Sequence, residues 1–484
     1  MPELVLDNIS GRVQLSLMQM RRPRAGHRRS PSALVGTLAL LAVGSTAVAS
    51  LGAPLLPMIE RVYGVSLAAS QWALTVTLLI GGVATPLMGR LGDGRLRCQT
   101  IIVTVVVMIA GCVLSALPTG FVGFLVGRAL QGAGLGLVPL ATAVARDNVG
   151  EERSRSTIAL IGITTAAGIG VGYPFAGLLA QYAGLSAPFC FVAALSAFAL
   201  VAAATVLPES PDRPAKVDAL GVALLGLGIT GLLLALTEGP AWGWAATKTI
   251  VTATGSVVML AAWAGWEFRA GSPLIELRLL RRTPVLAANT TAFLVSLGFY
   301  PLLSLVVRFV QTPAAAGYGF GASVIVAGLM LTPFSLASFA ASKVAARAAQ
   351  CATPEAIVAA NCIALIASTL LFFLAHGSYW EIVAAMALSG FGVGCIFAVN
   401  PLQIADGVPA HETGSAISFY QLVRTVAYSF GSALSATVLV LYIPRGASFP
   451  MATGYSAAAA ICTGLLVIAL VVSVLFAVLN RRAD

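Results

Sequence analysis

The chain has 484 residues, of which 58% are hydrophobic and 10% charged, and its formal net charge is +10. Soluble domains carry about 25% charged residues, so a chain this apolar cannot cover a surface that faces water. This composition excludes a soluble enzyme and makes lipid the solvent of the protein. Inside lipid, helices and closed barrels are the structures that satisfy every backbone polar group.

Fourteen apolar runs are long enough to cross a bilayer, which takes about 20 residues per helix. The runs are continuous and lack the alternation of barrel strands, so we expect helices and an all-α membrane protein. In chain order the predicted spans are 34–56, 70–88, 99–117, 121–143, 157–179, 187–207, 217–236, 249–267, 286–309, 319–340, 355–375, 380–400, 416–437 and 457–479.

Residues 1–33 precede the first span and contain six arginines. We interpret them as a basic cytoplasmic tail held near anionic lipid headgroups. A later start at Met18 or Met20 is a second interpretation. The remaining positive charge is spread over loops and not gathered in a soluble domain, so we expect no nucleic acid partner.

The loops divide the basic residues unequally between the two sides of the membrane. With the N-terminus in the cytoplasm, 22 of the 28 Lys and Arg residues fall on the inner side, three on the outer side and three within spans. Lys and Arg accumulate on the cytoplasmic side of membrane proteins. We therefore expect a multi-pass protein of the inner or plasma membrane with both termini in the cytoplasm.

Two longer loops, Leu207–Lys216 and Arg269–Pro284, bracket the seventh and eighth spans. They predict four parts of the chain. These are the tail at 1–33, a six-helix bundle at 34–207, a linker with two extra transmembrane helices at 208–284, and a six-helix bundle with a short tail at 285–484. Two six-helix halves related by a repeat describe one large class of transporters.

The loop between the second and third spans, residues 89–97, reads Gly-Arg-Leu-Gly-Asp-Gly-Arg-Leu-Arg. It resembles the loop signature of the major facilitator superfamily at Gly89, Leu91, Asp93 and Arg97. Glycine lets helix ends approach closely, and a carboxylate at a helix terminus can pair with an arginine. The resemblance implies a conformational switch that latches one face of the protein. The alternative is a plain turn with positive charges on the inner side.

The fourth span contains Arg128-Ala-Leu-Gln131-Gly132-Ala-Gly134, which resembles a second motif of the same superfamily. An arginine within a span is costly and is functional by default. Gln131 follows three residues later, so the two side chains share a helix face. We expect Arg128 and Gln131 to face a cavity and take part in coupling. The alternative is an arginine that reaches the headgroups.

The fifth span contains Gly168-Ile-Gly-Val-Gly172-Tyr-Pro174-Phe-Ala-Gly177, which resembles the motif of the superfamily's exporters. Small residues four apart make a smooth packing face, and proline bends the helix. The resemblance implies an exporter. Ordinary small-residue packing is the alternative, although it explains the added proline less well.

Further likeness lies at Ser70–Trp72, Glu238–Trp244 and 273–280. With fourteen spans, these segments resemble the fourteen-span drug:proton antiporter family. The resemblance implies a major-facilitator fold of two six-helix bundles plus a two-helix insert, 14 transmembrane helices in all. It also implies a secondary active transporter that exports small amphiphilic compounds by proton antiport and alternating access. The chain departs from the family in the first span, which has no acidic residue.

None of the 18 acidic residues falls in the middle of a span, whereas Arg128 and Arg424 do lie within spans. A bare cation in a low dielectric is costly, so we expect a neutral or anionic amphiphile as the small-molecule substrate. Proton partners remain an expectation from the resemblance, with carboxylates at the span ends as the coupling groups. These are Asp93, Asp406, Glu60 and Glu381. An uncoupled facilitator or importer of a small metabolite is the alternative.

Polar and aromatic side chains within spans are the expected pocket residues. The main ones are Trp72, Asn400 and Tyr420, and the others are Asn289, Tyr300 and Gln403. Asn400-Pro401 should break the twelfth span. The seven cysteines lack metal-ligand spacing, and no phosphate loop, nucleophile elbow or zinc motif occurs. We therefore expect no metal, no cofactor and no enzymatic activity.

Overall fold

The computed structural model describes residues 31–92, 94–149, 151–210, 218–271, 277–278, 282–349, 351–408, 413–445, 447 and 449–481. The regular elements of these residues are α-helices and short 3-10 helices. The basic tail prediction therefore falls almost entirely outside the described residues.

The helices of the first group are α2 (Pro31–Ser50), α3 (Leu56–Tyr63), α4 (Leu67–Gly92), α5 (Arg97–Ala116), α6 (Gly120–Gly132), α7 (Leu137–Asn148), α8 (Glu151–Ala183) and α9 (Ser186–Val206). Two further helices follow, α10 (Ala219–Trp242) and α11 (Thr247–Glu267). The second group comprises α12 (Thr283–Gln311), α13 (Val324–Ala348), α14 (Pro354–Leu374), α15 (Tyr379–Gly407), α16 (Thr413–Leu441) and α17 (Ala452–Arg481).

Thirteen stretches of the described residues are long and apolar enough to cross a membrane. The 33-residue α8 occupies the remaining predicted span, so helices occupy all fourteen predicted positions. Short 3-10 helices at Ala53–Leu55 and Ala133–Gly136 interrupt the first and fourth spans. The apolar pattern of the sequence does not predict these two interruptions. The predicted all-α membrane fold is confirmed.

The predicted tenth and twelfth spans differ from the structure. The tenth span begins at Val324 and not at residue 319. Gly319 and Gly321 adopt positive φ angles, which do not occur within an α-helix, and Ser323 then caps the N-terminus of α13. The predicted break at Asn400-Pro401 does not occur, since α15 continues through Pro401 to Gly407. Proline removes one N–H donor, and membrane helices tolerate this loss where neighbouring groups satisfy the freed carbonyl.

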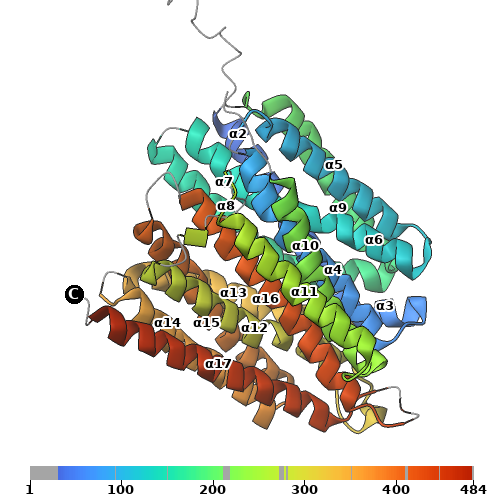
Figure 1. Ribbon diagram of the computed structural model, residues 1–484. Coiled ribbons are helices and arrows are strands. Elements are labelled where there is room, and N and C mark those ends of the chain that lie inside the picture. Colours follow the sequence, from blue (N-terminus) through green and yellow to red (C-terminus); the bar gives the residue numbers. More distant parts are fainter. Residues whose placement is uncertain are drawn as a thin grey trace, which may run out of the picture.

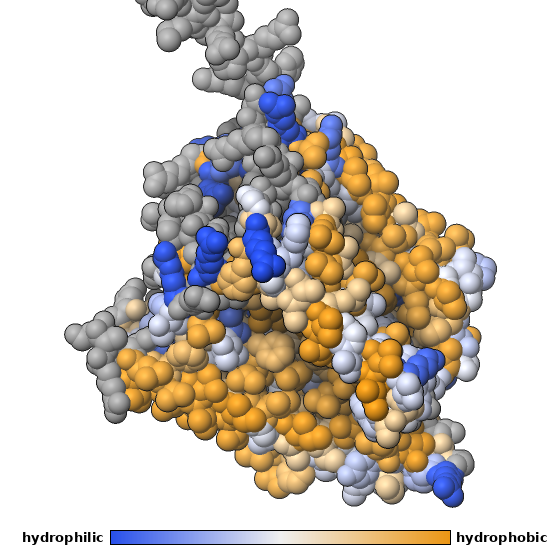
Figure 2. Space-filling model, viewed as in Figure 1, coloured by the Kyte–Doolittle hydropathy of each residue, from blue (hydrophilic) through white to orange (hydrophobic). Residues whose placement is uncertain are grey.

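The first described helix begins and the last one ends at the same end of the molecule (Figure 1). We call this the terminal end and the opposite one the distal end. Figure 2 shows strongly hydrophilic residues near the two ends and hydrophobic residues over the flanks between them. Charged groups thus lie where water would meet a membrane-embedded protein, which fits the lengths of the helices.

The two helix groups meet along two pairs of helices, α4 with α16 and α8 with α13. The α10–α11 pair lies across the first of these contacts (Figure 1). There, Leu79 of α4 and Leu422 of α16 share an apolar cluster with Leu225 and Leu233 of α10 and Trp263 of α11. The extra helices therefore cover one side of the boundary between the groups.

Candidate functional site

A cavity of about 540 Å³ lies between the two helix groups. Its walls come from α2, α4, α6, α7 and α8 on one side and from α12, α13, α15 and α16 on the other. Ligand pockets for small molecules span about 300–1,000 Å³, so the cavity has the size for one such molecule. Among the described residues, those that line it include Arg128 and Arg424 but no Asp or Glu.

Aromatic rings of the second helix group form one wall of the cavity. Tyr300 and Tyr428 are stacked, with ring centroids 4.6 Å apart and an interplanar angle of 21°. Phe299 meets both tyrosines edge to face and stacks on Phe334 at 5.8 Å. Phe397 also contacts Phe299, at 6.0 Å. All five rings line the cavity and offer apolar ring faces and edges to a bound molecule.

Arg424 lies against this wall. Its guanidinium carbon is 3.5 Å from the centre of the Phe397 ring, a cation–π contact. The Nη1 group donates to Gln421 Oε1 at 2.7 Å, and Nε and Nη2 donate to the Tyr428 hydroxyl at 3.2 and 2.7 Å. Gln421 and Tyr428 belong to the same helix as Arg424, so the arginine is held on α16 by neutral groups.

Arg128 lies on the opposite wall and is only 1% exposed. Its Nε donates to Ala73 O of α4 at 3.0 Å, and its Nη1 donates to Gln131 Oε1 at 2.6 Å. Gln131 in turn donates to Gly111 O and Ser115 Oγ of α5 at 3.1 and 2.9 Å. The predicted pair therefore ties three helices together behind the cavity, with Arg128 reaching its surface and Gln131 buried.

The predicted switch loop is described except for Asp93, which lies outside the described residues, so its role is untested. Gly89 and Leu91 lie in the last turn of α4, half-buried. Arg97 is 3% exposed at the start of α5, donates to Gly92 O and forms an ion pair of 2.8 Å with Asp147 of α7. This pair joins helices of the first group at the terminal end.

The glycines of the fifth span contact two different helices. Gly168 lies against Thr46 and Gly172 against Ser50, both on α2. A Cβ atom on Gly177 would lie 2.6 Å from Val324 O of α13. Pro174 lies inside α8, between these contacts. The motif therefore brings α8 close to α2 and to the second helix group at once, whether or not it determines the direction of transport.

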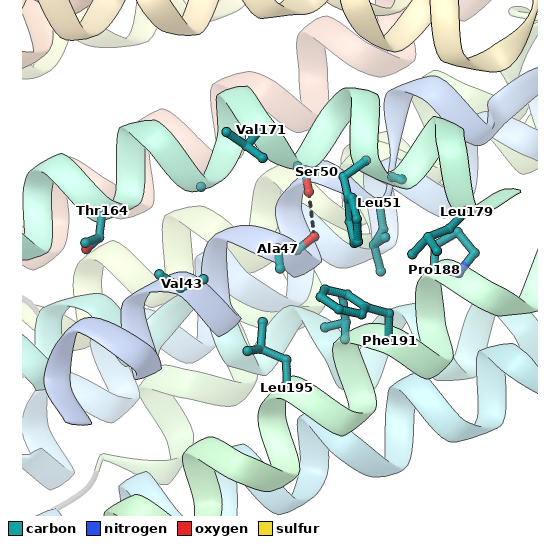
Figure 3. A pocket seen from close by; sticks show the side chains of 15 residues that line it. Val43, Ala47, Ser50, Leu51, Thr164, Val171, Leu179, Pro188, Phe191 and Leu195 are labelled. Carbon is teal, nitrogen blue, oxygen red and sulfur yellow. Dashed lines mark hydrogen bonds between the residues drawn. The ribbon is translucent and has the colours of Figure 1, made fainter. Parts of the chain in front are cut away.

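A separate apolar groove of about 490 Å³ lies among α2, α8 and α9 (Figure 3). Ser50 and Ala47 of α2, Val171 of α8 and Phe191 of α9 point into it (Figure 3). The Ser50 hydroxyl donates to Ala47 O at 2.8 Å and is therefore satisfied within α2. Val171 is 67% exposed, which places the groove on the outer flank of the molecule.

Substitution of Gly328 tests the close contact of α8 with α13. A Cβ atom on Gly328 would lie 2.6 Å from Tyr173 O and 2.9 Å from Pro174 Cα. These are backbone atoms that cannot rotate away, so Gly328→Val should push the helices apart and lower both melting temperature and transport. Overpacking of this kind costs about 1–3 kcal/mol. Gly464→Ala is the matched control, because no atom lies within 4 Å of its Cβ position. Equal melting temperatures of the two variants would contradict the prediction.

A polar network that the sequence analysis missed joins the two helix groups at the distal end. Arg308 of α12, 5% exposed, forms an ion pair with Glu60 of α3 and donates to Ser70 Oγ at 2.9 Å and Gln71 Oε1 at 3.2 Å, both on α4. Gln71 donates to Ser432 Oγ of α16 at 2.6 Å. We call these five residues the distal latch. An arginine near the end of a span was the signal available in the sequence.

The three main pocket predictions do not fall on the lining of the central cavity. Trp72 donates to Glu238 Oε1 of α10 at 3.2 Å, and Asn400 donates to Ala288 O of α12 at 3.1 Å. Tyr420 is 1% exposed, with its ring centre 5.3 Å from the Arg424 guanidinium carbon. Tyr300, a lesser candidate, does line the cavity.

Glu381, which the sequence analysis expects to be a coupling group, caps the N-terminus of α15. Its side chain accepts from the Ser378 backbone N–H, and its own backbone N–H donates to the Ser378 side chain.

Comparison with known proteins supports the motif resemblances. The chain is 27% identical to "Multidrug resistance protein Stp" of Mycobacterium tuberculosis (strain ATCC 25618 / H37Rv) over 398 residues, 80% of this chain and 72% of that protein. It is 29% identical to the "Tetracenomycin C resistance and export protein" of Streptomyces glaucescens over 329 residues, 65% of this chain and 58% of that protein.

The fold matches that of solved transporters. The crystal structure of the human organic anion transporter MFSD10 (TETRAN) superposes with a TM-score of 0.63 at 16% identity, covering 92% of this chain and 100% of that one. This similarity shows a shared fold. The family model of the Major Facilitator Superfamily matches residues 38–432 and, in a second match, 302–484. The chain therefore belongs to the Major Facilitator Superfamily.

Proposed function

We propose that this protein exports small amphiphilic compounds across the cell membrane by alternating access. The observation that carries the proposal is the central cavity, which lies between two helix groups and beneath the distal latch. The names of the relatives, one a multidrug resistance protein and one an export protein, support export as the direction. A bundle closed at one end by a breakable network suits alternating access.

The substrate of this proposal is a neutral or anionic amphiphile. In the part of the chain that the structure describes, two guanidinium groups and no carboxylate line the cavity. A cation in that place would be repelled by both arginines and would find no counter-charge among the lining residues. The five aromatic rings provide the apolar contacts that an amphiphile needs.

Sidedness follows from the basic residues. The loops at the terminal end carry most of the Lys and Arg residues, and such loops face the cytoplasm. With this orientation, the distal latch seals the outer side and the cavity belongs to an inward-facing state. We keep the division into bundles at 34–207 and 285–484, with 208–284 as linker and insert, as part of the proposal.

Proton antiport is the proposed driving force, as in the family that the motifs resemble. Glu60 is the carboxylate best placed to act, because it joins the two helix groups through Arg308. No carboxylate occurs among the described residues that line the cavity, which favours a second candidate, an uncoupled facilitator or importer of a small metabolite.

Flux measurements in proteoliposomes with an imposed pH gradient separate these functions. For proton antiport we expect substrate movement to follow the gradient and to stop when an ionophore collapses it. Equal flux with and without the gradient would favour the facilitator. If no compound of an amphiphile panel moves in either condition, the proposed transport function is wrong.

A further inference from the structure

The two arginines of the central cavity differ in what holds them. Arg128 donates to a backbone carbonyl of another helix and to Gln131, which is itself bonded to α5. Its position is fixed by the packing of three helices. Arg424 bonds to Gln421 and Tyr428 of its own helix and stacks on Phe397. Its hydrogen-bond partners all belong to α16, so Arg424 can exchange one of them without breaking a hydrogen bond between helices, although its contact with Phe397 of α15 joins two helices.

Arg424 also has hydrogen-bonding capacity to spare. A guanidinium carries five N–H donors. Three bonds to Gln421 and Tyr428 use one donor each. One N–H on each of Nη1 and Nη2 remains beyond these three bonds, and the buried Tyr420 hydroxyl also interacts with the guanidinium. Two terminal N–H groups at fixed spacing match the two oxygens of a carboxylate or a similar oxyanion.

No carboxylate of the described residues forms an ion pair with Arg424, and none lines the cavity. Its charge is balanced within the cavity by the Tyr428 hydroxyl, the Gln421 amide and the face of Phe397. Neutral dipoles compensate a charge in a low dielectric less well than an anion does. A bound anion would therefore balance the positive charge of Arg424 more fully than these neutral groups do.

The aromatic wall lies directly beside this charge. Tyr428 bonds to Arg424 through its hydroxyl and stacks on Tyr300 through its ring. Phe299 meets Tyr428 edge to face and stacks on Phe334, so these two rings continue the aromatic wall at a steep angle to the tyrosines. A molecule whose oxyanion meets Arg424 would thus place an attached flat ring system against this aromatic wall, where stacking adds to the apolar contact.

Resting on the proposed export function, we infer that the substrates of this cavity are planar aromatic acids, and that Arg424 is the residue that recognises their single negative charge. Arg128 holds the opposite wall and does not select the charge. The rings of Phe299, Tyr300, Phe334 and Tyr428 select flat aromatic molecules. Quaternary ammonium compounds, which aromatic rings can also bind, are disfavoured by the two arginines.

Three probes of equal size but different charge test this inference. These are pyrenebutyric acid, its primary amide and pyrenebutylamine, which are anionic, neutral and cationic at neutral pH. Binding is measured by fluorescence on the purified full chain in phosphatidylcholine nanodiscs, with protein-free nanodiscs as the blank. For the wild type we expect the acid to bind about 10- to 100-fold more tightly than the amide, the range for hydrogen bonds to a charged group.

Arg424→Gln should bring the affinities of acid and amide to within about threefold of each other, while the amide itself binds as in the wild type. Arg424→Lys retains the charge but loses the planar guanidinium that can donate two parallel N–H bonds to a carboxylate. This variant should show an intermediate preference for the acid over the amide. Arg445→Gln removes an exposed arginine from the loop after α16 and should keep the full preference.

The inference is overturned if the amine binds most tightly to the wild type, or if Arg424→Gln keeps the preference for the acid. The wild-type comparison decides the substrate charge even if Arg424→Gln does not fold. Transport of the amide without preference for the acid would overturn this inference but not the export function. Failure of all three probes and of the amphiphile panel to move would count against the export function itself.

Discussion

Arg128→Ala is expected to abolish export and to destabilise the folded protein. The substitution removes the donor to Ala73 O and the partner of Gln131, and it leaves both polar groups in a buried site. Hydrogen bonds from a charged donor contribute about 1.5–3 kcal/mol each, so the loss amounts to about 3–6 kcal/mol. Export from a pump-deficient host and the melting temperature of the purified protein measure the two effects.

Gln131→Glu is the informative companion to this variant. It keeps an acceptor for Arg128 but replaces the amide that donates to Gly111 O and Ser115 Oγ. We expect a smaller loss of stability than for Arg128→Ala, because the new carboxylate pairs with the guanidinium. Wild-type export and wild-type melting temperature in Arg128→Ala would show that the predicted motif has no role in this protein.

Glu60→Ala is expected to open the distal end of the protein. Removing one partner of a fully buried ion pair costs about 3–5 kcal/mol, because the other charge remains unpaired, and this pair, in which the Glu60 side chain is 25% exposed, should cost no more than the lower end of that range. Arg308 would regain water when the two helix groups separate at this end, so the equilibrium should shift toward the open state. A bias of 3 kcal/mol corresponds to a shift of about 150-fold.

Labelling from outside the cell measures this shift. The seven native cysteines are replaced, and Leu303→Cys, on the cavity lining, reports access of a membrane-impermeant maleimide. Glu60→Ala should raise the labelling rate by about tenfold or more and reduce export. Arg61→Ala, which removes the exposed neighbouring charge, should leave labelling unchanged.

The charge exchange of Glu60→Arg with Arg308→Glu provides the stricter test. The double variant keeps an ion pair between α3 and α12, so labelling should return toward the parent value. Equal labelling rates for Glu60→Ala and the parent would contradict the role of the distal latch. The same holds if the double variant is labelled as fast as either single variant.

Features of the chain that are local in sequence could be predicted. The spans follow from runs of apolar residues, and the Arg128–Gln131 bond follows from a separation of three residues on one helix. The Arg97–Asp147 pair joins residues 50 positions apart, and Glu60 and Arg308 are separated by 248 positions. No pattern along the chain indicates such partners, because they depend on which helices pack together.

A bundle of membrane-spanning helices of the major-facilitator type could be predicted from the amino-acid sequence, because apolar runs and loop motifs consist of consecutive residues. The tertiary structure decided which side chains share the cavity. In a soluble helix the polar face marks the side that meets water, but here the faces toward lipid and toward other helices are both apolar. Trp72, Asn400 and Tyr420 were therefore assigned to the pocket without knowledge of their facing. Only packing revealed that Arg424 meets the aromatic wall of Tyr300 and Phe397.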